Sequence, residues 1–296
     1  MISYKALDAN GELINSKMSP FTYPAGEVSI KFEDSRKFEQ SELAVLQFEK
    51  GSIHDDLVKY LMWDEVMNNN THRNSHDLSL ILPYMPGARE DRGRVFGLLT
   101  YMKILETSVG VDNVVVFDPH SDVTNLYLKA WGLESSTKIN ILSTADLVRQ
   151  RPWAFEGYDY VVAPDEGATD RAQSVADVMG VPVVQVVKSR DFETGKITGL
   201  IAPEIDDTKK YLVIDDLCDG GRTFTLLSDN LGLPKEQIDL YVSHGVFSKG
   251  TAELEKKFGR IITTNSYLSD AVLDGVLRKN GVEVLDVIHP MIDLIK

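Results

Sequence analysis

Short apolar runs rich in Val, Ile and Leu alternate with helical patterns along most of this chain. Such β-branched runs are typical of strands that are buried on both faces, as in parallel sheets joined by crossover helices. Helical patterns at Val95–Thr107, Arg171–Met179 and Thr251–Phe258 supply crossovers. The predicted strands are Leu78–Leu82, Val114–Asp118, Tyr158–Pro164, Val181–Lys188, Tyr211–Asp215, Asp239–Ser243 and Arg260–Thr264. The pattern predicts an α/β protein with mainly parallel sheets flanked by helices.

The N-terminal part has a different pattern. Ala6–Ile14 and Val28–Glu33 are predicted to be short β segments, and the Pro–Gly turn at Phe21–Glu27 lies between them. The polar segment Asn68–Asn74 is predicted to be an exposed loop. We place the boundary between two βα sets near Gly132–Asn140, which divides the chain into domains 1–137 and 138–296.

Composition limits the possible partners and compartment. The chain has 296 residues, enough for about two domains, and its net charge of −14 argues against nucleic-acid or anionic-membrane partners. Its single cysteine, Cys218, excludes an intramolecular disulfide and fits a reducing compartment. No His–acid pattern adjoins Cys218, so we interpret it as a packing residue. No apolar run approaches about 18 residues, and Met1–Asn15 lacks a signal-peptide pattern, so we expect a cytoplasmic protein.

Polar residues gather where several predicted strands end. Ligands of parallel α/β folds bind at the carboxyl ends of the strands. This coincidence therefore favours a binding site over scattered surface charge. The four segments are Asp118-Pro119-His120, Pro164-Asp165-Glu166-Gly167, Lys188-Ser189-Arg190 and Asp215-Asp216.

The most informative segment is Val213–Thr223. Asp215 and Asp216 end an apolar strand, and a tight glycine turn then leads into a helical pattern at Phe224–Leu231. That order directs backbone N–H groups and a helix N-terminus at an anion. Two carboxylates beside a bound phosphate suit a sugar phosphate, because they can hold vicinal hydroxyls or a metal. The alternative is an acidic strand end followed by an ordinary turn.

The other segments are weaker when taken alone. His120 can ligate Mg²⁺ or a phosphate, or it only caps a turn. Asp165 can hold a metal or water, and the small residues after it admit a diphosphate, although Arg171 is equally well a solvated side chain. Lys188 and Arg190 suit closure over a transferring diphosphoryl group, or they are a solvated basic pair.

The arginines of Tyr84–Arg92 can contact nucleotide phosphates or stack on a base. Several common motifs are missing from the sequence: G-x-x-x-x-G-K-[ST], G-x-G-x-x-G, H-E-x-x-H and paired C-x-x-C. Any nucleotide chemistry must therefore use another phosphate cradle.

In their order, these segments resemble the ribose-phosphate diphosphokinases (phosphoribosyl pyrophosphate, PRPP, synthetases) from about Tyr23 to Phe247. The glycine loop alone is shared with all phosphoribosyltransferases, whereas the whole series is specific to the synthetases. The matching segments are the adenine-contacting hairpin Tyr23–Ser29, the P-Y-x-x-x-A-R-x-D-R segment Tyr84–Arg92, the D-x-H motif Asp118–Asp122, the pyrophosphate loop Pro164–Ala172, the catalytic loop Lys188-x-Arg190, the ribose-phosphate loop Asp215–Thr223 and the late segment Ser243–Ser248.

The resemblance implies two phosphoribosyltransferase-like domains, and a transfer of diphosphate from Mg-ATP to the anomeric hydroxyl of ribose 5-phosphate. It also implies a homo-oligomer in which the hairpin reaches a neighbouring subunit's nucleotide. The implied roles are catalysis for Lys188 and Arg190; ribose-phosphate binding for Asp215, Asp216, Asp219, Gly220, Gly221, Arg222 and Thr223; ATP binding for Tyr23, Glu27, Arg89, Glu90, Asp91, Arg92 and His120; and Mg²⁺ binding for His120 and Asp165.

The chain departs from the family pattern at three places. Ala25 stands where the hairpin usually has aspartate, and Glu90 replaces a glutamine. Gly220-Gly221-Arg222-Thr223 stands where T-G-G-T is usual. Arg222 adds a planar, always-charged group to the phosphate loop. That favours a more highly charged or esterified substrate, unless the side chain only faces solvent.

Three alternatives remain open from the sequence. Some divergent, viral-type relatives transfer diphosphate to ADP-ribose, which gives ADP-ribose pyrophosphate for NAD synthesis. A phosphoribosyltransferase would need only the Asp215–Thr223 loop. A non-catalytic regulatory member is disfavoured because Lys188 and Arg190 are both present.

Overall fold

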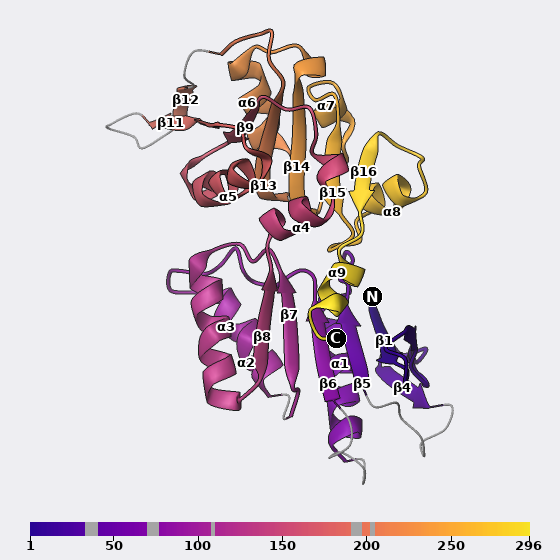
Figure 1. The fold of residues 1–296 in the computed structure, drawn as a ribbon. Coiled ribbons are helices and arrows are strands. Elements are labelled where there is room, and N and C mark those ends of the chain that lie inside the picture. The colour runs from indigo at the N-terminus through magenta and orange to yellow at the C-terminus, as the bar shows by residue number, and fades with distance from the viewer. Residues whose placement is uncertain (33–40, 70–76, 108–109, 191–196, 202–204) are drawn as a thin grey trace. The chain divides into compact units, whose positions relative to one another are not determined.

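The computed structural model describes residues 1–32, 41–69, 77–107, 110–190, 197–201 and 205–296 (Figure 1). The chain forms two compact units: unit 1 is Met1–Leu142 with Val287–Lys296, and unit 2 is Ser143–Asp286. This division differs from the predicted one after residue 137. Lys138–Leu142 is an edge strand of the first sheet, and the C-terminal helix packs against two strands of that same sheet.

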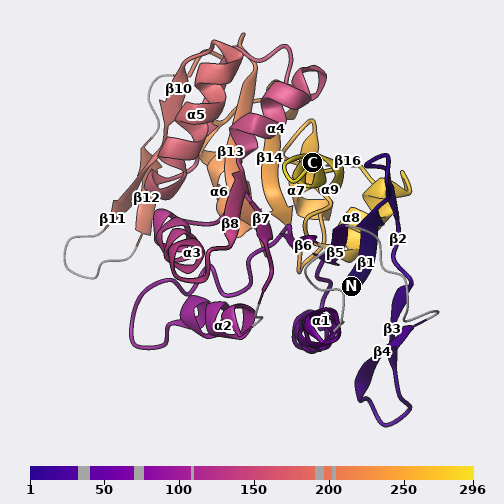
Figure 2. The ribbon, with the colours of Figure 1, turned by 60° about the horizontal axis from the view of Figure 1, so that its bottom comes forward.

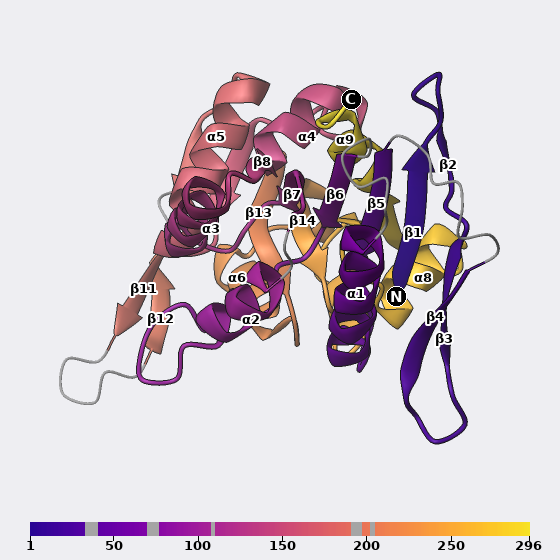
Figure 3. The same cartoon turned by 90° about the horizontal axis from the view of Figure 1, so that it is seen from below.

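Unit 1 is built on a six-stranded sheet with the order β2-β1-β5-β6-β7-β8. Strands β5 to β8 are parallel, and β1 pairs antiparallel with both β2 and β5. Helix α2 packs against both α1 and α3, and α9 packs against β6 and β7 (Figure 3). The elements are β1 (Ile2–Leu7), β2 (Leu13–Asn15), β5 (Ser41–Leu46), β6 (Asp77–Leu82), β7 (Asn113–Phe117), β8 (Lys138–Leu142), α1 (Ile53–Asn68), α2 (Gly97–Glu106), α3 (Asp122–Ser135) and α9 (Ile288–Asp293).

A separate two-stranded ribbon, β3 (Met18–Thr22) and β4 (Val28–Phe32), carries the predicted Pro–Gly turn. Gly26 closes this turn with φ +96°, a left-handed conformation that costs glycine little. The segment Ala6–Ile14 is a hairpin in place of the single predicted β segment, because the chain reverses between β1 and β2. Most of the predicted loop Asn68–Asn74 lies outside the described residues.

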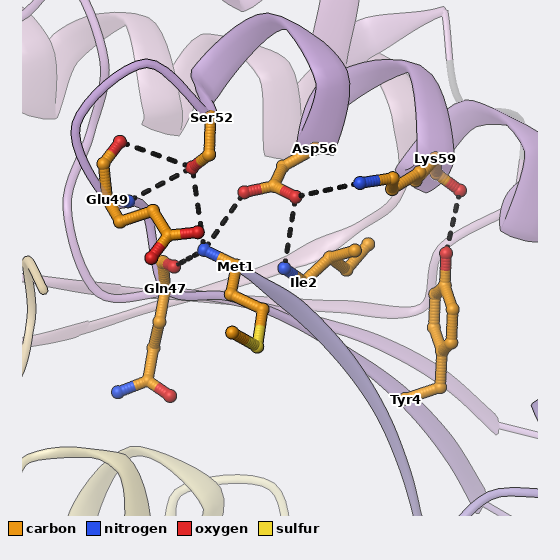
Figure 4. Close-up of polar contacts among 8 residues, drawn as sticks. All are labelled: Met1, Ile2, Tyr4, Gln47, Glu49, Ser52, Asp56 and Lys59. Atoms are coloured by element: carbon orange, nitrogen blue, oxygen red, sulfur yellow. Dashed lines mark hydrogen bonds and ion pairs between the residues drawn. The ribbon is translucent and has the colours of Figure 1, made fainter. Parts of the chain in front are cut away.

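Buried Asp56 of α1 ties the first strand to this helix (Figure 4). Its carboxylate, 2% exposed, accepts the Ile2 N–H at 3.1 Å and lies 3.0 Å from the Met1 amine. Lys59 stands 3.8 Å away, and its backbone carbonyl accepts the Tyr4 hydroxyl at 3.0 Å. Burial, followed by the charge of Asp56, raises the pKa of Tyr4. A charged helix residue thus fixes the start of β1 against α1.

Unit 2 is built on a wholly parallel sheet with the order β10-β9-β13-β14-β15-β16. Helices α4 and α5 pack together (Figure 2). Helices α6, α7 and α8 contribute Phe224, Leu254 and Val272 to one core with β13 and β14. The elements are α4 (Thr144–Gln150), β9 (Tyr160–Ala163), α5 (Thr169–Met179), β10 (Val183–Gln185), β13 (Tyr211–Cys218), α6 (Arg222–Leu231), β14 (Ile238–Gly245), α7 (Ala252–Glu255), β15 (Ile261–Thr264), α8 (Asp270–Val276) and β16 (Val282–Leu285).

The predicted fold class, α/β with two mainly parallel sheets, is confirmed. Six of the seven predicted strands recur as single strands with shifted ends. The seventh, Val181–Lys188, is divided between β10 and β11 (Val187–Arg190), and β11 leaves the sheet to pair antiparallel with β12 (Ile197–Ile201). Among the described residues, no helix is long and apolar enough to cross a membrane.

Candidate functional site

The two acids of the glycine-loop segment lie on the part of β13 that extends past its neighbour. Pairing between β13 and β9 ends at Val213, so Asp215 and Asp216 lie beyond the end of β9. The Asp216 N–H donates to Asp215 Oδ1 at 2.9 Å. Asp216 is 5% exposed, and the guanidinium of Arg171 approaches its carboxylate to 3.8 Å. Arg171 side-chain exposure is 11%, so it is a member of the site and not a solvated side chain.

Asp165 completes a cluster of three carboxylates and one guanidinium. It follows β9 and caps the short 3₁₀ turn Glu166–Ala168, where its carboxylate accepts the Ala168 N–H at 3.3 Å. Burial raises the pKa of Asp215 well above its ordinary value, and the charges of Asp216 and Asp165 raise it further, against the opposing charge of Arg171. The cluster therefore favours the binding of a proton, a metal ion or the hydroxyl donors of a substrate.

The glycine loop joins β13 to α6. Gly221 has φ +74° and forms the N-cap of α6, and a Cβ on it would meet the Leu254 side chain at 3.3 Å. Arg222 and Thr223, the first residues of the helix, are exposed. The N-terminal N–H groups of an α-helix lack intrahelical partners, so this end of α6 can bind a phosphate.

Cys218 lies under this loop and is fully buried. Burial raises the pKa of its thiol to about 12, with further contributions from the charges of Asp215 and Asp219. A thiol so resistant to ionisation is a poor nucleophile. The prediction that Cys218 is a packing residue is confirmed.

Lys188 and Arg190 lie on β11, where they pair with Leu200 and Ile197 of β12. Their side chains lie outside what the structure describes, as does the segment 191–196. The catalytic roles assigned to these residues therefore stay predictions.

In unit 1, two predicted segments meet at the ends of neighbouring strands β6 and β7. Asp91, which is buried, accepts hydrogen bonds from Ser121 Oγ and, at 3.0 Å, from Arg92 Nε. Burial alone would raise the pKa of Asp91, but these hydrogen bonds and the charges of Arg92 and His120 outweigh it and leave the pKa lowered. Asp91 thus joins the Tyr84–Arg92 segment to the D-x-H motif.

The other predicted nucleotide-binding residues of these two segments are exposed around Asp91: Arg89, Glu90, Arg92 and His120. Asp118, directly after β7, is buried with φ +39°. A buried non-glycine residue in that conformation is strained, and such strain concentrates at functional sites.

Tyr23 and Glu27 lie on the β3–β4 ribbon. The Tyr23 N–H donates to the Glu27 carbonyl at 2.7 Å, and the half-exposed Tyr23 ring packs edge-on against Phe21. Within the described part of the chain, no hydrogen bond or ion pair joins Tyr23 or Glu27 to the Asp91 region. The hairpin presents an aromatic side chain to solvent, as a nucleotide contact requires.

The two predicted metal ligands lie in different units, His120 in unit 1 and Asp165 in unit 2. Among the described residues, no three His, Cys, Asp or Glu side chains are grouped so that they could hold a metal ion. Mg²⁺ rarely uses an all-protein cage and is commonly held by one or two carboxylates plus substrate phosphates and water. The carboxylates of unit 2 fit that donor set.

Parallel sheets with a helix-capping glycine loop after paired acids define a protein of the phosphoribosyltransferase-like class. A family model described as the phosphoribosyl transferase domain matches residues 143–255, which begin where unit 2 begins. A crystal structure of the phosphoribosylpyrophosphate synthetase from Mycobacterium smegmatis superposes with a TM-score of 0.72 at 20% identity. It covers 95% of this chain and 90% of that one. This likeness shows the fold.

Related sequences carry the assignment further. The ribose-phosphate pyrophosphokinase of Pyrococcus furiosus is 25% identical over 82% of this chain and 87% of its own length. The one from Saccharolobus solfataricus is 30% identical over 52% of this chain, and the match spans only about half (53%) of that relative. Over most of its length this chain is therefore similar to transferases named ribose-phosphate pyrophosphokinases.

Proposed function

We propose that this protein transfers the β,γ-diphosphoryl group of Mg-ATP to the anomeric hydroxyl of ribose 5-phosphate, giving PRPP and AMP. The observation that supports this most directly is the cluster of Asp165, Arg171, Asp215 and Asp216, in which Asp215 and Asp216 lie on β13 just before the glycine loop. Asp215 and Asp216, which are suited to sugar hydroxyls, and the phosphate-binding end of α6 thus belong to one strand and turn.

In the proposed reaction the anomeric oxygen forms a bond to the β-phosphorus of ATP. The bond between that phosphorus and the oxygen bridging to the α-phosphorus breaks, AMP leaves and the hydroxyl proton is released. Such transfers depend mainly on positioning and on stabilisation of charge, so no nucleophilic side chain is required. The inert thiol of Cys218 agrees with this.

The residues have the following proposed roles. Gly220, Gly221, Arg222 and Thr223 bind the 5′-phosphate, while Asp215 and Asp216 orient the ribose hydroxyls. Asp165 and His120 are each proposed to help hold Mg²⁺, which when bound would neutralise charge on the diphosphate. Lys188 and Arg190 stabilise the transferring group. The proposed nucleotide contacts are Tyr23, Glu27, Arg89, Glu90, Asp91, Arg92 and His120, and we propose a homo-oligomer that shares this site between subunits.

The test measures AMP release from ATP and ribose 5-phosphate with Mg²⁺ and no nucleobase. AMP release with formation of PRPP supports the proposal. A phosphoribosyltransferase would release no AMP here, and would instead form pyrophosphate from PRPP and a base. A parallel reaction with ADP-ribose is warranted because Arg222 is exposed at the loop. Faster AMP release with ADP-ribose would replace the acceptor in the proposal, and no release with either acceptor would contradict it.

A further inference from the structure

Lys249 lies beside the glycine loop, although its sequence position in the turn after β14 gives no sign of this. A Cβ built on Gly220 would stand 3.6 Å from both Cδ and Cε of Lys249 and 3.9 Å from its Cγ. The methylene stem therefore packs over the backbone of Gly220. Its ammonium, one bond beyond Cε, belongs to the surroundings of the loop.

The turn that carries Lys249 is anchored to this loop by hydrogen bonds. The Phe247 N–H donates to the Cys218 carbonyl at 2.9 Å, and the Ser248 N–H donates to the Asp219 carbonyl at 3.0 Å. The Ser248 hydroxyl also donates to the Asp219 carboxylate. Lys249 is thus held in register with the glycine loop.

The local sequence requires an unusual backbone to reach this position. Phe247 is buried with φ +44°, a strained conformation for an aromatic residue. Its ring fills the space beside Gly245, where a Cβ would stand only 2.3 Å from the ring. The strain is kept because packing and hydrogen bonds together fix the turn.

The charges of Lys249 and Arg222 indicate which kind of ligand binds beside the glycine loop. Lys249 and Arg222 are both exposed, and neither forms an ion pair or side-chain hydrogen bond with any residue that the structure describes. They flank the helix end in a chain of net charge −14, with Asp215, Asp216 and Asp219 nearby in sequence. Two exposed cations that pair with none of these acids suit an anionic ligand.

We propose that Lys249 binds the phosphate group of the sugar substrate from the Gly220 side of the loop. This makes it a residue that determines specificity for phosphorylated over unphosphorylated sugars. The proposal rests on the proposed function, because it takes the glycine loop as the site of the sugar's phosphate. Arg222 contributes its charge from the first turn of α6.

The test compares Lys249→Met, which keeps the stem and removes the charge, with Lys249→Arg, which keeps a charge. Lys235→Met is the matched control, because Lys235 is an exposed lysine just before β14, at the opposite end of that strand. We expect Lys249→Met to raise KM for ribose 5-phosphate about 10- to 100-fold, the worth of one charge-assisted hydrogen bond. The KM for ATP and kcat should change little, Lys249→Arg should stay within a few-fold, and Lys235→Met should match the unmodified protein.

Titration calorimetry with ribose 5-phosphate and with ribose, without ATP, separates this proposal from the reaction itself. If the unmodified protein binds ribose 5-phosphate and Lys249→Met binds it at least about tenfold more weakly, the proposal holds even when no AMP is formed. Equal binding by both proteins, with unchanged urea midpoints, overturns it. Failure of the unmodified protein to prefer ribose 5-phosphate over ribose also overturns it.

Discussion

In unit 2, carboxylates lie near both ends of the neighbouring strands β13 and β14, and the groups around these carboxylates differ between the two ends. Asp239 stands near the start of β14 and is 1% exposed. Its carboxylate accepts the Tyr158 hydroxyl at 2.7 Å and the Arg260 N–H at 2.8 Å, and Lys210 Nζ lies 3.1 Å away. Arg260 also donates to the Tyr158 hydroxyl at 3.2 Å. Donors and cations thus compensate this buried charge.

At the other end, Asp215 and Asp216 lie side by side with Asp165 nearby and the Arg171 guanidinium 3.8 Å from Asp216. Burial raises the pKa of Asp215, and the neighbouring carboxylates of Asp216 and Asp165 raise it further. The comparison indicates that Asp239 stabilises the fold. The paired acids Asp215 and Asp216 instead destabilise the unliganded protein, and a bound ligand offsets this loss of stability. Variants at each end should therefore separate stability from activity.

The largest effect is expected at Asp239. Asp239→Ala leaves Lys210, the Arg260 N–H and the Tyr158 hydroxyl without their acceptor, which should lower the free energy of unfolding by about 3–5 kcal/mol. Urea denaturation measures the loss. Asp229→Ala is the control, since Asp229 forms an exposed ion pair with Lys257 and its removal should cost under about 1 kcal/mol. Equal losses of unfolding free energy in the two variants would show that the contacts of Asp239 stabilise the protein no more than an exposed ion pair does.

Next is Asp216→Asn, which keeps the side-chain volume and removes the charge beside Arg171. We expect kcat/KM for AMP release to fall about 100-fold, because the acceptor sugar loses its orientation. The urea midpoint should change little, and Asp177→Asn, an exposed position of α5, should leave both quantities unchanged. Full activity in Asp216→Asn would remove the distinction between the two ends of the sheet.

A smaller effect is expected from Tyr158→Phe. Loss of one buried hydroxyl should cost about 1 kcal/mol of unfolding free energy and leave catalytic activity intact. Combining it with Asp239→Asn gives a double-mutant cycle, whose coupling energy measures the Tyr158–Asp239 hydrogen bond. Strictly additive changes would mean that the two side chains stabilise the unit independently.

The local sequence pattern was enough to predict the sheet of unit 2 and the glycine loop that follows the paired acids. The β-branched strands and the turn at Gly220–Gly221 predicted the parallel sheet and the helix end, because buried strands and left-handed turns limit which residues fit. Asp165 was placed correctly after its strand. Asp215 and Asp216 were expected at the end of a strand, whereas β13 continues to Cys218 and they lie within it, beyond the end of β9. Their roles with substrate stay predictions.

The missed features depend on contacts between distant segments. Arg171 joins the site through α5, and Lys249 through hydrogen bonds to a loop about thirty residues earlier, and nothing local distinguishes either from a solvated cation. Strands β5, β8 and β16 were not predicted. Polar residues such as Glu42, Asn140 and Glu283 interrupt their apolar runs, and pairing with neighbours decides their conformation.

The smallest effect expected on stability, and the one with a distinctive pH dependence, is that of Asp215→Asn. Because the folded-state pKa of Asp215 is raised, the folded protein holds this proton over a range of pH where the unfolded chain has lost it. The stability contributed by the protonated carboxyl is therefore complete below the ordinary Asp pKa and is lost as pH rises through the folded pKa. The asparagine variant has no such loss, so at neutral pH we expect it to be more stable by about 1 kcal/mol, although inactive. Urea midpoints of both proteins from pH 4 to pH 8 measure this difference, which should grow with pH. A difference that is constant, or that shrinks as pH rises, would mean that the paired carboxylates do not strain the unliganded fold.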